Sequence, residues 1–425
     1  MPAVLGCLVR MSEQIRSASS SRAVAAPLVP RDAFPLLTAR DIAYLDSAAS
    51  AQKPKVVLDR MRQFYETSYA NIHRAVYPLS EAATEAYESA RARVAAFLGA
   101  PSPASIVFTR NATEAVNLVA NSFGGSHLKS GDRILVTMLE HHANIVPWQL
   151  LRDRLGLELL VAPIDTAGDL DLDALDGLLA QAPKLVAVTA TSNVLGTRTP
   201  IEEIVARAHR AGAVVLVDAA QAAPHGAIDV TAWDCDFLVF TGHKLYGPDG
   251  IGVLYGKPDL LAAMPPWQGG GDMIRTVTFA RTEFADPPQR FEAGTPPIGP
   301  AIGLAAAIDF IEGVGWSRIE AHDRALTRYA LDRLEEIPGV SPVGAPRDRI
   351  GIVSFTLDGV HPHDVGSLLG ERGVCVRTGH HCAQPLMDHL GLAGTVRASF
   401  GVHSDTSDID RLAEALVAAR QILAR

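Results

Sequence analysis

The sequence predicts an α/β protein with a large domain, built on a mostly parallel central sheet, and a small α+β domain at its C-terminal end. From about residue 85 to 300, short apolar runs alternate with segments of helical periodicity, which is typical of βαβ crossovers. The apolar runs are polar on neither face, so we expect both faces of the sheet to be covered. After about residue 300 the pattern changes to long helices followed by separate strands, which indicates a second domain.

The length of the chain supports this division. A chain of 425 residues is long for one hydrophobic core, and 48% hydrophobic with 20% charged residues is globular composition. We expect a disordered tail over 1–30, a large domain over 31–310 and a small domain over 311–425. The tail resembles a transit peptide in its arginines and serine run, although a downstream start at Met11 explains the same residues more simply.

The elements of the large domain follow from periodicity and from turn residues. Helical spacing up to residue 98, with Gly99 as the C-cap, predicts a first helix, and a strand at 105–109 leads into a helix that should begin at Thr113. A further helix is expected over 201–211. The remaining strands are predicted at 133–138, 158–163, 184–189, 214–217, 236–240 and 251–255.

The small domain begins with a long helical run and ends with an amphipathic helix. Helices are predicted over 301–312 and 316–337, and the last helix should be capped by Thr406 or Ser407. Between them we expect strands at 351–357, 373–376 and 396–401. The segment 264–300, rich in proline and glycine, is predicted to form extended loops over the large domain.

Composition and charge exclude several classes of function. The formal charge of −9, without a lysine or arginine patch, argues against nucleic acid as a partner. No apolar stretch reaches the roughly 18–20 residues needed to cross a bilayer, so we expect no membrane. Four scattered cysteines without a CxxC motif favour a reducing compartment, and we expect the protein to be cytoplasmic.

Two predicted strands of the large domain end in polar clusters about 25 positions apart. The first ends at Asp218, with Gln221 three residues on, and the second ends in Thr241, His243 and Lys244. Ligands of open α/β sheets bind beyond the carboxyl ends of the strands. An acid and an amine at that edge suit pyridoxal phosphate (PLP), whose aldehyde forms a Schiff base with lysine and whose ring nitrogen pairs with an acid. The alternative is a buried ion pair between neighbouring strands, but that explains the full set of polar residues poorly.

Other strand ends add candidate ligands at the same edge. The turn that ends at Thr113 could bind a phosphate with free amides and a hydroxyl, together with Thr241 and His243, although any capped helix looks similar. His141 could stack on a cofactor ring and move a proton, whereas we interpret His142 as an exposed loop residue. Asn193 could bind a ring hydroxyl or a substrate carboxylate.

The small domain contributes a candidate nucleophile. Cys382 follows Arg377, His380 and His381, and neighbouring cations favour the thiolate form that attacks electrophiles. The same residues could bind a metal, but adjacent ligands fit tetrahedral zinc poorly, so we expect none. Arg397, on a predicted strand, could hold a carboxylate with two hydrogen bonds, the alternative being a surface arginine.

Together these segments resemble the group II (SufS/CsdA-like) cysteine desulfurases, in the class V branch of fold-type I PLP enzymes. The resemblance covers about residues 33–424. The most specific motifs are Thr241-Gly-His-Lys-Leu-Tyr-Gly-Pro248, Arg377-Thr-Gly-His-His-Cys-Ala383, Glu140-His-His-Ala-Asn-Ile-Val-Pro-Trp148, Asn71-Ile-His-Arg74 and Arg290-Phe-Glu-Ala-Gly-Thr-Pro296.

The resemblance implies a role for each matching residue. Cys382, Lys244 and His141 would be catalytic. The cofactor would be PLP, held by Lys244, Asp218, Gln221, His141, Thr113, Thr241, His243 and, from the partner subunit of a homodimer, Thr295. Substrate would be bound by Asn193, Arg397, Arg377 and His73. The chain departs from the usual pattern at Ala112, Thr241 and Tyr77, and none of these changes removes a catalytic group.

The activity implied is removal of sulfur from L-cysteine to give L-alanine and a persulfide on Cys382. A SufE- or SufU-like acceptor would then collect the sulfur for iron–sulfur cluster assembly. Selenocysteine lyase and a kynureninase-like class V enzyme are the alternatives within the fold. A sulfur-handling scaffold that no longer uses PLP is the non-enzyme alternative, and Lys244 and Asp218 argue against it.

Overall fold

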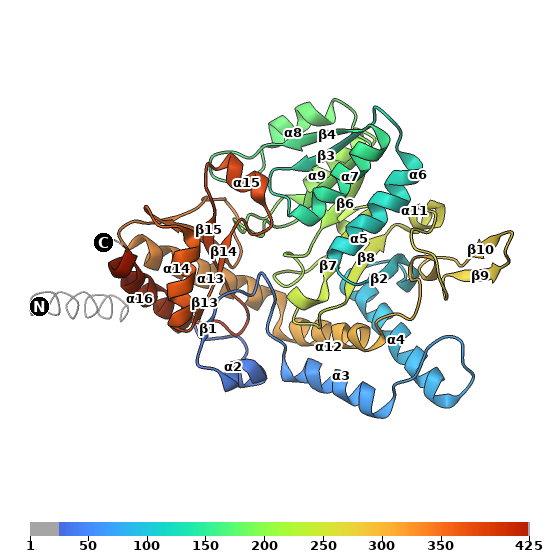
Figure 1. Ribbon diagram of the computed structural model, residues 1–425, viewed down its shortest axis with the longest axis horizontal. Helices are drawn as coiled ribbons and strands as arrows, with labels where there is room; N and C mark the ends of the chain where they lie inside the picture. The colour runs from blue at the N-terminus through green and yellow to red at the C-terminus, as the bar shows by residue number, and fades with distance from the viewer. Residues whose placement is uncertain (1–24, 424–425) are drawn as a thin grey trace, which may run out of the picture.

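The computed structural model describes residues 25–423, which form a large and a small domain side by side (Figure 1). Most of the predicted tail, residues 1–24, lies outside the described residues. Residues 25–30 run along the body of the protein, where the amide of Val29 donates to the carbonyl of Val402 over 2.9 Å.

A seven-stranded sheet forms the centre of the large domain, in the order β2-β8-β7-β6-β5-β3-β4. Strand β8 is antiparallel to both neighbours and every other pairing is parallel, which confirms the mostly parallel sheet. The strands span Ile106–Thr109 (β2), Arg133–Thr137 (β3), Glu158–Ala162 (β4), Leu185–Thr189 (β5), Val214–Asp218 (β6), Phe237–Thr241 (β7) and Gly252–Gly256 (β8).

Both faces of the sheet are buried, as the apolar runs predicted. Successive side chains of a strand point to opposite faces, so Val186 and Val188 of β5 join one hydrophobic core while Leu185 and Ala187 join the other. The covering helices are α4 (Pro78–Phe97), α5 (Ala112–Val119), α7 (Val146–Leu155), α8 (Leu172–Leu179), α9 (Ile201–Arg210) and α12 (Ile298–Val314).

The small domain is built on an antiparallel sheet in the order β11-β12-β15-β14. Its strands span Val340–Pro342 (β11), Ile352–Leu357 (β12), Arg377–Gly379 (β14) and Thr395–Ser399 (β15). Helices α13 (Trp316–Glu335), α14 (Pro362–Glu371) and α16 (Thr406–Leu423) accompany the sheet, and the short helix α15 (Gln384–His389) lies toward the large domain (Figure 1).

Segments distant in sequence join the two domains. Strand β1 (Ala43–Tyr44), from the predicted large domain, pairs in parallel with β13 (Val374–Cys375) of the small domain. The predicted boundary at 310/311 falls inside α12, which continues into α13 after a bend of 75° at Gly315. No single helix of the described chain is long and apolar enough to cross a membrane, although this bent pair together has that length and composition.

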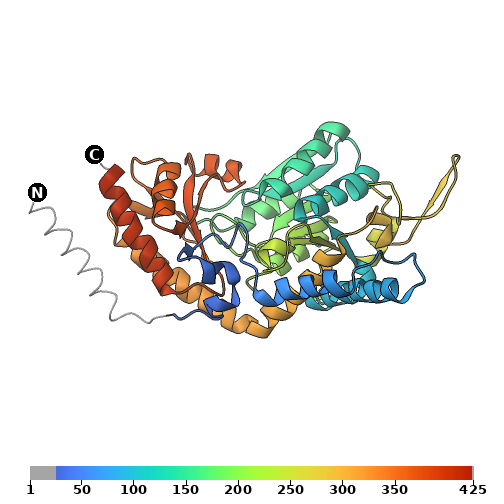
Figure 2. The ribbon, with the colours of Figure 1, turned by 60° about the horizontal axis from the view of Figure 1, so that its bottom comes forward.

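Local corrections to the predicted elements come from side-chain caps and from a hairpin. Helix α5 begins at Ala112, not Thr113, because the Asn111 side chain accepts from the amide of Glu114 as the N-cap. The amides of Ser407 and Asp408 donate to Asp405, which therefore caps α16 in place of the predicted residues. The 264–300 segment is not all loop: it forms the hairpin β9 (Ile274–Val277) and β10 (Thr282–Phe284), which projects from the large domain (Figure 2).

Candidate active site

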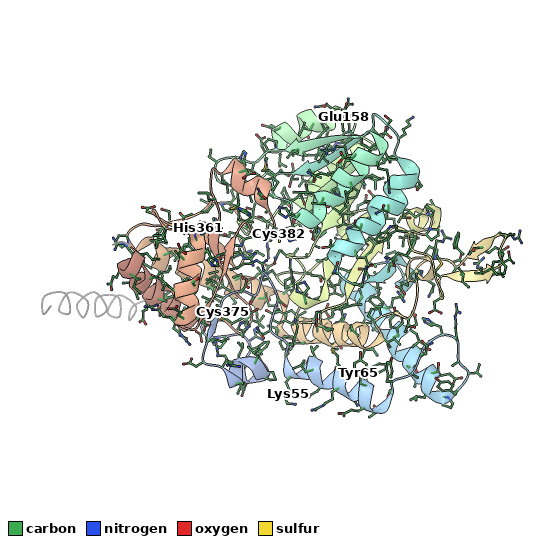
Figure 3. The ribbon with its side chains drawn as sticks, in the orientation of Figure 1. Lys55, Tyr65, Glu158, His361, Cys375 and Cys382 are labelled. Carbon is green, nitrogen blue, oxygen red and sulfur yellow. The ribbon has the colours of Figure 1, made fainter. Side chains whose placement is uncertain are left out.

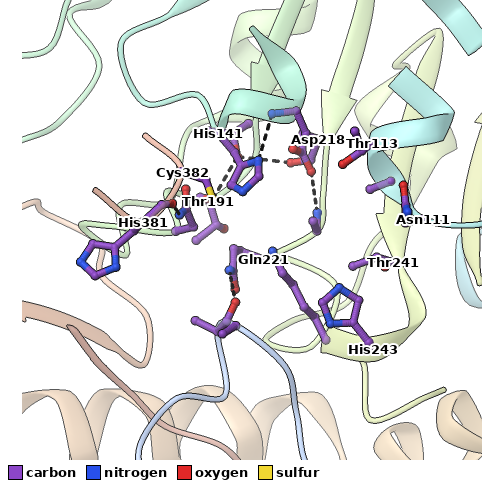
Figure 4. A pocket seen from close by; sticks show the side chains of 18 of the residues that line it. Asn111, Thr113, His141, Thr191, Asp218, Gln221, Thr241, His243, His381 and Cys382 are labelled. Carbon is purple, nitrogen blue, oxygen red and sulfur yellow. Dashed lines mark hydrogen bonds between the residues drawn. The ribbon is translucent and has the colours of Figure 1, made fainter. Parts of the chain in front are cut away.

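A cavity of about 280 Å³ lies at the carboxyl ends of β5, β6 and β7, where the small domain meets the sheet. Most of the predicted site residues line it: Thr113, His141, Asn193, Asp218, Gln221, Thr241, His243, Lys244, Arg377, Cys382 and Arg397. In Figure 3 Cys382 lies near the junction of the two domains, apart from Cys375. Figure 4 shows the predicted phosphate ligands on one side of the cavity and Cys382 on the other, with His141, Asp218 and Gln221 between them.

The acid, Asp218, and the amine, Lys244, lie together in a buried part of the cavity at this edge of the sheet. Asp218 ends β6 with 4% of its surface exposed, and burial raises the pKa of its carboxyl against the opposing effects of the Ala220 amide and Lys244. Burial lowers the pKa of Lys244 to about 8, although the carboxylate of Asp218 acts in the opposite direction. An amine of this kind reaches its neutral, nucleophilic form near neutral pH.

Several buried polar atoms lack a partner within the described part of the chain, and two of them belong to Gln221 and Thr241, which line the cavity. Gln221 donates from Nε2 to the carbonyl of Ala48 over 2.8 Å, which leaves its Oε1 without a hydrogen bond. The hydroxyl of Thr241 is likewise unpartnered. Because buried polar groups are nearly always hydrogen-bonded, these atoms indicate that a polar ligand belongs here, and PLP fits them with its ring hydroxyl and its phosphate.

The side of the cavity predicted to bind phosphate is an open helix N-terminus. Asn111 caps the Glu114 amide of α5 at 2.8 Å, while the amides of Ala112 and Thr113 belong to the first turn, which has no intrahelical acceptor. Strand β8 passes close behind this turn, since a Cβ on Gly252 would lie 2.4 Å from the backbone carbon of Asn111. The observed geometry therefore requires glycine at position 252.

His141 is held as a neutral ring beside the amine. Its Nδ1 accepts from the amide of Ala143 at 3.0 Å, which places the proton of the neutral ring on Nε2. Burial, and then the charge of Lys244, lower the pKa of His141 to about 3. A neutral aromatic ring suits the predicted stacking on a cofactor ring, which stays a prediction.

The loop that carries Cys382 is fixed by hydrogen bonds to the large domain. Asn193 donates from Nδ2 to the carbonyl of His381 over 2.6 Å, and the amide of His142 donates to the carbonyl of Cys382 over 2.7 Å. The interpretation of His142 as an exposed loop residue is wrong, because the ring is half-buried and its Nε2 accepts from the amide of Gln384 at 3.0 Å. His381 is also buried, and its ring points away from the cavity (Figure 4).

Two arginines stand opposite one another on the small sheet. Arg377 of β14 and Arg397 of β15 are register partners, so their side chains share one face and both line the cavity. Arg397 is 2% exposed and donates to the carbonyl of Asn193 and to Asp46, while its Nε has no partner among residues 25–423. Burial lowers the pKa of Arg397 to about 10, against the effect of Asp46. The pair favours an anionic ligand such as a carboxylate.

Two predicted residues do not line the cavity of the single chain. His73, with φ of 69°, is paired from Nε2 to Glu88 at 2.9 Å. Thr295 lines a separate cavity of about 310 Å³ with Arg110, Trp267 and other residues. Their assignments to substrate and to phosphate stay predictions.

The sequence did not reveal the buried carboxyl of Glu140, which lies three residues after the end of β3. Its oxygens accept from Thr137 at 2.6 Å, Asn144 at 2.7 Å and the amide of Thr189 at 2.9 Å. Burial raises the pKa of Glu140 to about 8 despite these donors. The one available signal was an acid directly before two histidines at a strand end. Within residues 25–423 no group of three acids, histidines or cysteines is arranged to hold a metal ion.

An acid and a lysine at neighbouring strand ends, with an open helix N-terminus beside them, define a PLP-dependent enzyme of fold type I. The aminotransferase class-V family matches residues 43–412, and the chain belongs to this family. It is 52% identical over 395 residues to a cysteine desulfurase of Dickeya dadantii, which covers 92% of this chain and 96% of the relative.

Solved structures agree with this family. The cysteine desulfurase CsdA (S-sulfonic acid) from Escherichia coli is 40% identical, with a TM-score of 0.87, over 92% of this chain and 98% of that one. A C-DES mutant with glycine covalently linked to its PLP cofactor is 25% identical, with a TM-score of 0.80, over 92% of this chain and 99% of that one. The predicted fold type and cofactor class are confirmed.

The lowered pKa of Lys244 gives a prediction for the cofactor-free protein. Only a neutral amine attacks an aldehyde, so the rate of PLP binding should rise with pH and level off above about 8, well below the ordinary lysine value of 10.5. Asp218→Asn removes the charge that raises this pKa, so its profile should move to lower pH. Absorbance at the Schiff-base band follows the rate, and a profile that rises through pH 10 in both proteins would contradict the assignment.

Proposed function

We propose that this protein is a PLP-dependent cysteine desulfurase that transfers sulfur from L-cysteine to Cys382 and releases L-alanine. One observation carries the proposal: Cys382 lines the same cavity as Lys244 and Asp218, although it comes from the other domain. The similarity to relatives named cysteine desulfurases supports the same activity. A kynureninase-like class V enzyme has no use for a thiol at this place.

Each end of the cavity holds a different part of the reactants. Lys244 would bind the cofactor aldehyde, Asp218 the ring nitrogen, Gln221 the ring hydroxyl, and Thr113, Thr241 and His243 the phosphate. When bound, PLP supplies an electron sink that stabilises negative charge on the α-carbon of the substrate. The unpartnered atoms of Gln221 and Thr241 are the observation that fits this placement.

The protein's own groups perform the remaining steps. Arg397, with Arg377 beside it, would hold the substrate carboxylate, which fixes the orientation of the amino acid. Lys244, as a neutral amine, accepts the α-proton. The sulfur of Cys382 attacks the substrate sulfur, and the carbon–sulfur bond breaks with its electron pair left on carbon. Protonation of that carbon, and return of a proton from Lys244 to the α-carbon, complete L-alanine. The transferred sulfur stays on Cys382 as a persulfide.

The activity is tested by product analysis with L-cysteine under a reductant. We expect L-alanine and sulfide in equal amounts. The same assay with selenocysteine separates the proposal from selenocysteine lyase, because the proposal requires the higher kcat/KM with cysteine at saturating reductant. Absence of alanine from protein that carries PLP would contradict the proposal.

A conservative change at Arg397 should affect substrate binding more than chemistry. Arg397→Lys keeps the charge but loses the planar fork, so KM for L-cysteine should rise about 10- to 100-fold, as expected for loss of a charged hydrogen bond. Cofactor absorbance should stay unchanged. Steady-state kinetics measure the effect, and an unchanged KM would show that the carboxylate is held elsewhere.

We further propose a homodimer, an acceptor protein of the SufE or SufU type, and a cytoplasmic role in iron–sulfur cluster assembly. In the dimer Thr295 of the partner subunit would reach the phosphate. Exposed apolar side chains around 65–79, among them Val76 at 94% exposure, support a covered surface there. Sedimentation with and without a candidate acceptor tests both associations.

A further inference from the structure

The Cys382 loop has a backbone that its residues do not favour by themselves. His381 and Cys382 have φ angles of 52° and 57°, in the left-handed region that few residues other than glycine adopt. Two such residues in succession persist only where surrounding contacts hold them. The contacts that hold this turn therefore determine where the thiol points.

Those contacts come largely from the large domain, across the domain junction. Asn193, which follows β5, donates a hydrogen bond to the carbonyl of His381. His142, in the turn after β3, donates from its backbone amide to the carbonyl of Cys382. The Nε2 of His142 then accepts from the amide of Gln384, the first residue of α15. His142 is thus the one residue in this set that binds the loop on both sides of Ala383, once with its backbone and once with its ring.

The ring is in the right state for this contact. Burial, and then the neighbouring His380, lower the pKa of His142, so Nε2 is an unprotonated acceptor at neutral pH. The amide of Gln384 lies at the start of α15, where it has no intrahelical acceptor. The imidazole supplies the missing acceptor and fixes the beginning of the helix relative to the sheet.

From this geometry we propose that His142 is a positioning residue for the sulfur-transfer step, which holds the Cys382 loop in its strained conformation through the Nε2 contact with Gln384. The inference rests on the proposed function, because the step it serves is attack by Cys382 on the substrate sulfur. It does not place His142 in contact with substrate or cofactor. Misplacing a nucleophile by about 1 Å can slow attack by about 100-fold, so such a contact can control turnover.

Two substitutions with side chains of different length distinguish this positioning role of His142 from simple packing. His142→Gln places an amide oxygen near the former position of Nε2, whereas His142→Asn is too short to reach Gln384. Both keep the backbone amide that binds the carbonyl of Cys382. We expect kcat of the asparagine variant to fall about tenfold with KM within twofold, and the glutamine variant to recover to within about threefold of the parent.

A second readout does not depend on turnover. The rate at which iodoacetamide alkylates Cys382 in the PLP-loaded protein, measured by mass spectrometry of its peptide, should rise several-fold in His142→Asn because the released loop exposes the thiol. It should stay near the parent value in His142→Gln. His389→Ala, an exposed histidine at the end of the same helix, is the control and should change neither quantity.

The outcomes distinguish the inference from the proposed function. Equal behaviour of the asparagine and glutamine variants in both readouts, or alkylation at the parent rate in His142→Asn, overturns the positioning role. If the parent protein makes no alanine from cysteine, the proposed function fails, yet the alkylation rates still report whether His142 holds the loop.

Discussion

Lys244→Ala will abolish the release of alanine and sulfide from L-cysteine, with kcat reduced by at least about 10⁴-fold. The substitution removes both the group that binds the cofactor aldehyde and the base that accepts the α-proton. The buried amine has a pKa of about 8, so no exposed lysine with an ordinary pKa replaces it at neutral pH. Steady-state product formation at saturating cysteine and added PLP measures the loss.

The matched control is Lys55→Ala. Lys55 is an exposed lysine at the start of α3 (Lys55–Thr67) that pairs with Asp59 and does not line the cavity. Its variant should keep the parent kcat and the parent absorbance. Turnover by Lys244→Ala within tenfold of the parent would mean that another group binds the cofactor.

The second large effect concerns the thiol. Cys382→Ala should keep the cofactor absorbance, because none of the groups assigned to PLP is changed, and should lose sulfide production by at least about 100-fold. The substrate should still bind between Arg397 and Lys244 in this variant. The absorbance of the bound cofactor should therefore still change when cysteine is added. Spectral titration and a sulfide assay together separate binding from transfer.

Cys375→Ala tests whether the effect belongs to one cysteine. Cys375 also lies in the small domain, on β13, where it pairs with Tyr44 outside the cavity. This variant should retain transfer. Sulfide production at the parent rate by Cys382→Ala, with or without an acceptor, would remove Cys382 from the mechanism.

The residues that the sequence placed well are those at the ends of long, buried strands. Asp218 and Lys244 lie at the ends of apolar runs that fit only the buried strands of a central sheet. The carboxyl ends of parallel strands meet at one edge of such a sheet, whatever the conformation of the loops. The same reasoning placed His141 and Asn193 at the cavity. The pattern of apolar residues was sufficient to place these strands, because few structures other than a central strand bury both faces of an apolar run.

The contacts that the sequence could not reveal join positions far apart in the chain. His142 looked like an exposed residue because nothing nearby indicates that its partner is Gln384, 242 positions away. Arg397 could equally have been on the surface, and its burial depends on packing between the domains. Strand β1 has only two residues, too few for any period to show.

At the start of two helices, several neighbouring residues could each have been the N-cap. At α5 both Asn111 and Thr113 can cap a helix, and asparagine prevails one position before the helix begins. At α16 the same competition favours Asp405 over Thr406 and Ser407. Such shifts move a boundary by one or two residues and leave the cavity unchanged.

The central claim is that sulfur passes from the substrate to Cys382, and one mass spectrum tests it most directly. The protein with PLP bound is incubated with L-cysteine without reductant, separated from it and digested. We predict that the peptide carrying Cys382 gains the mass of one sulfur atom, while the peptides with Cys235 and Cys375 do not. An unmodified Cys382 peptide from protein that has released alanine would contradict the account.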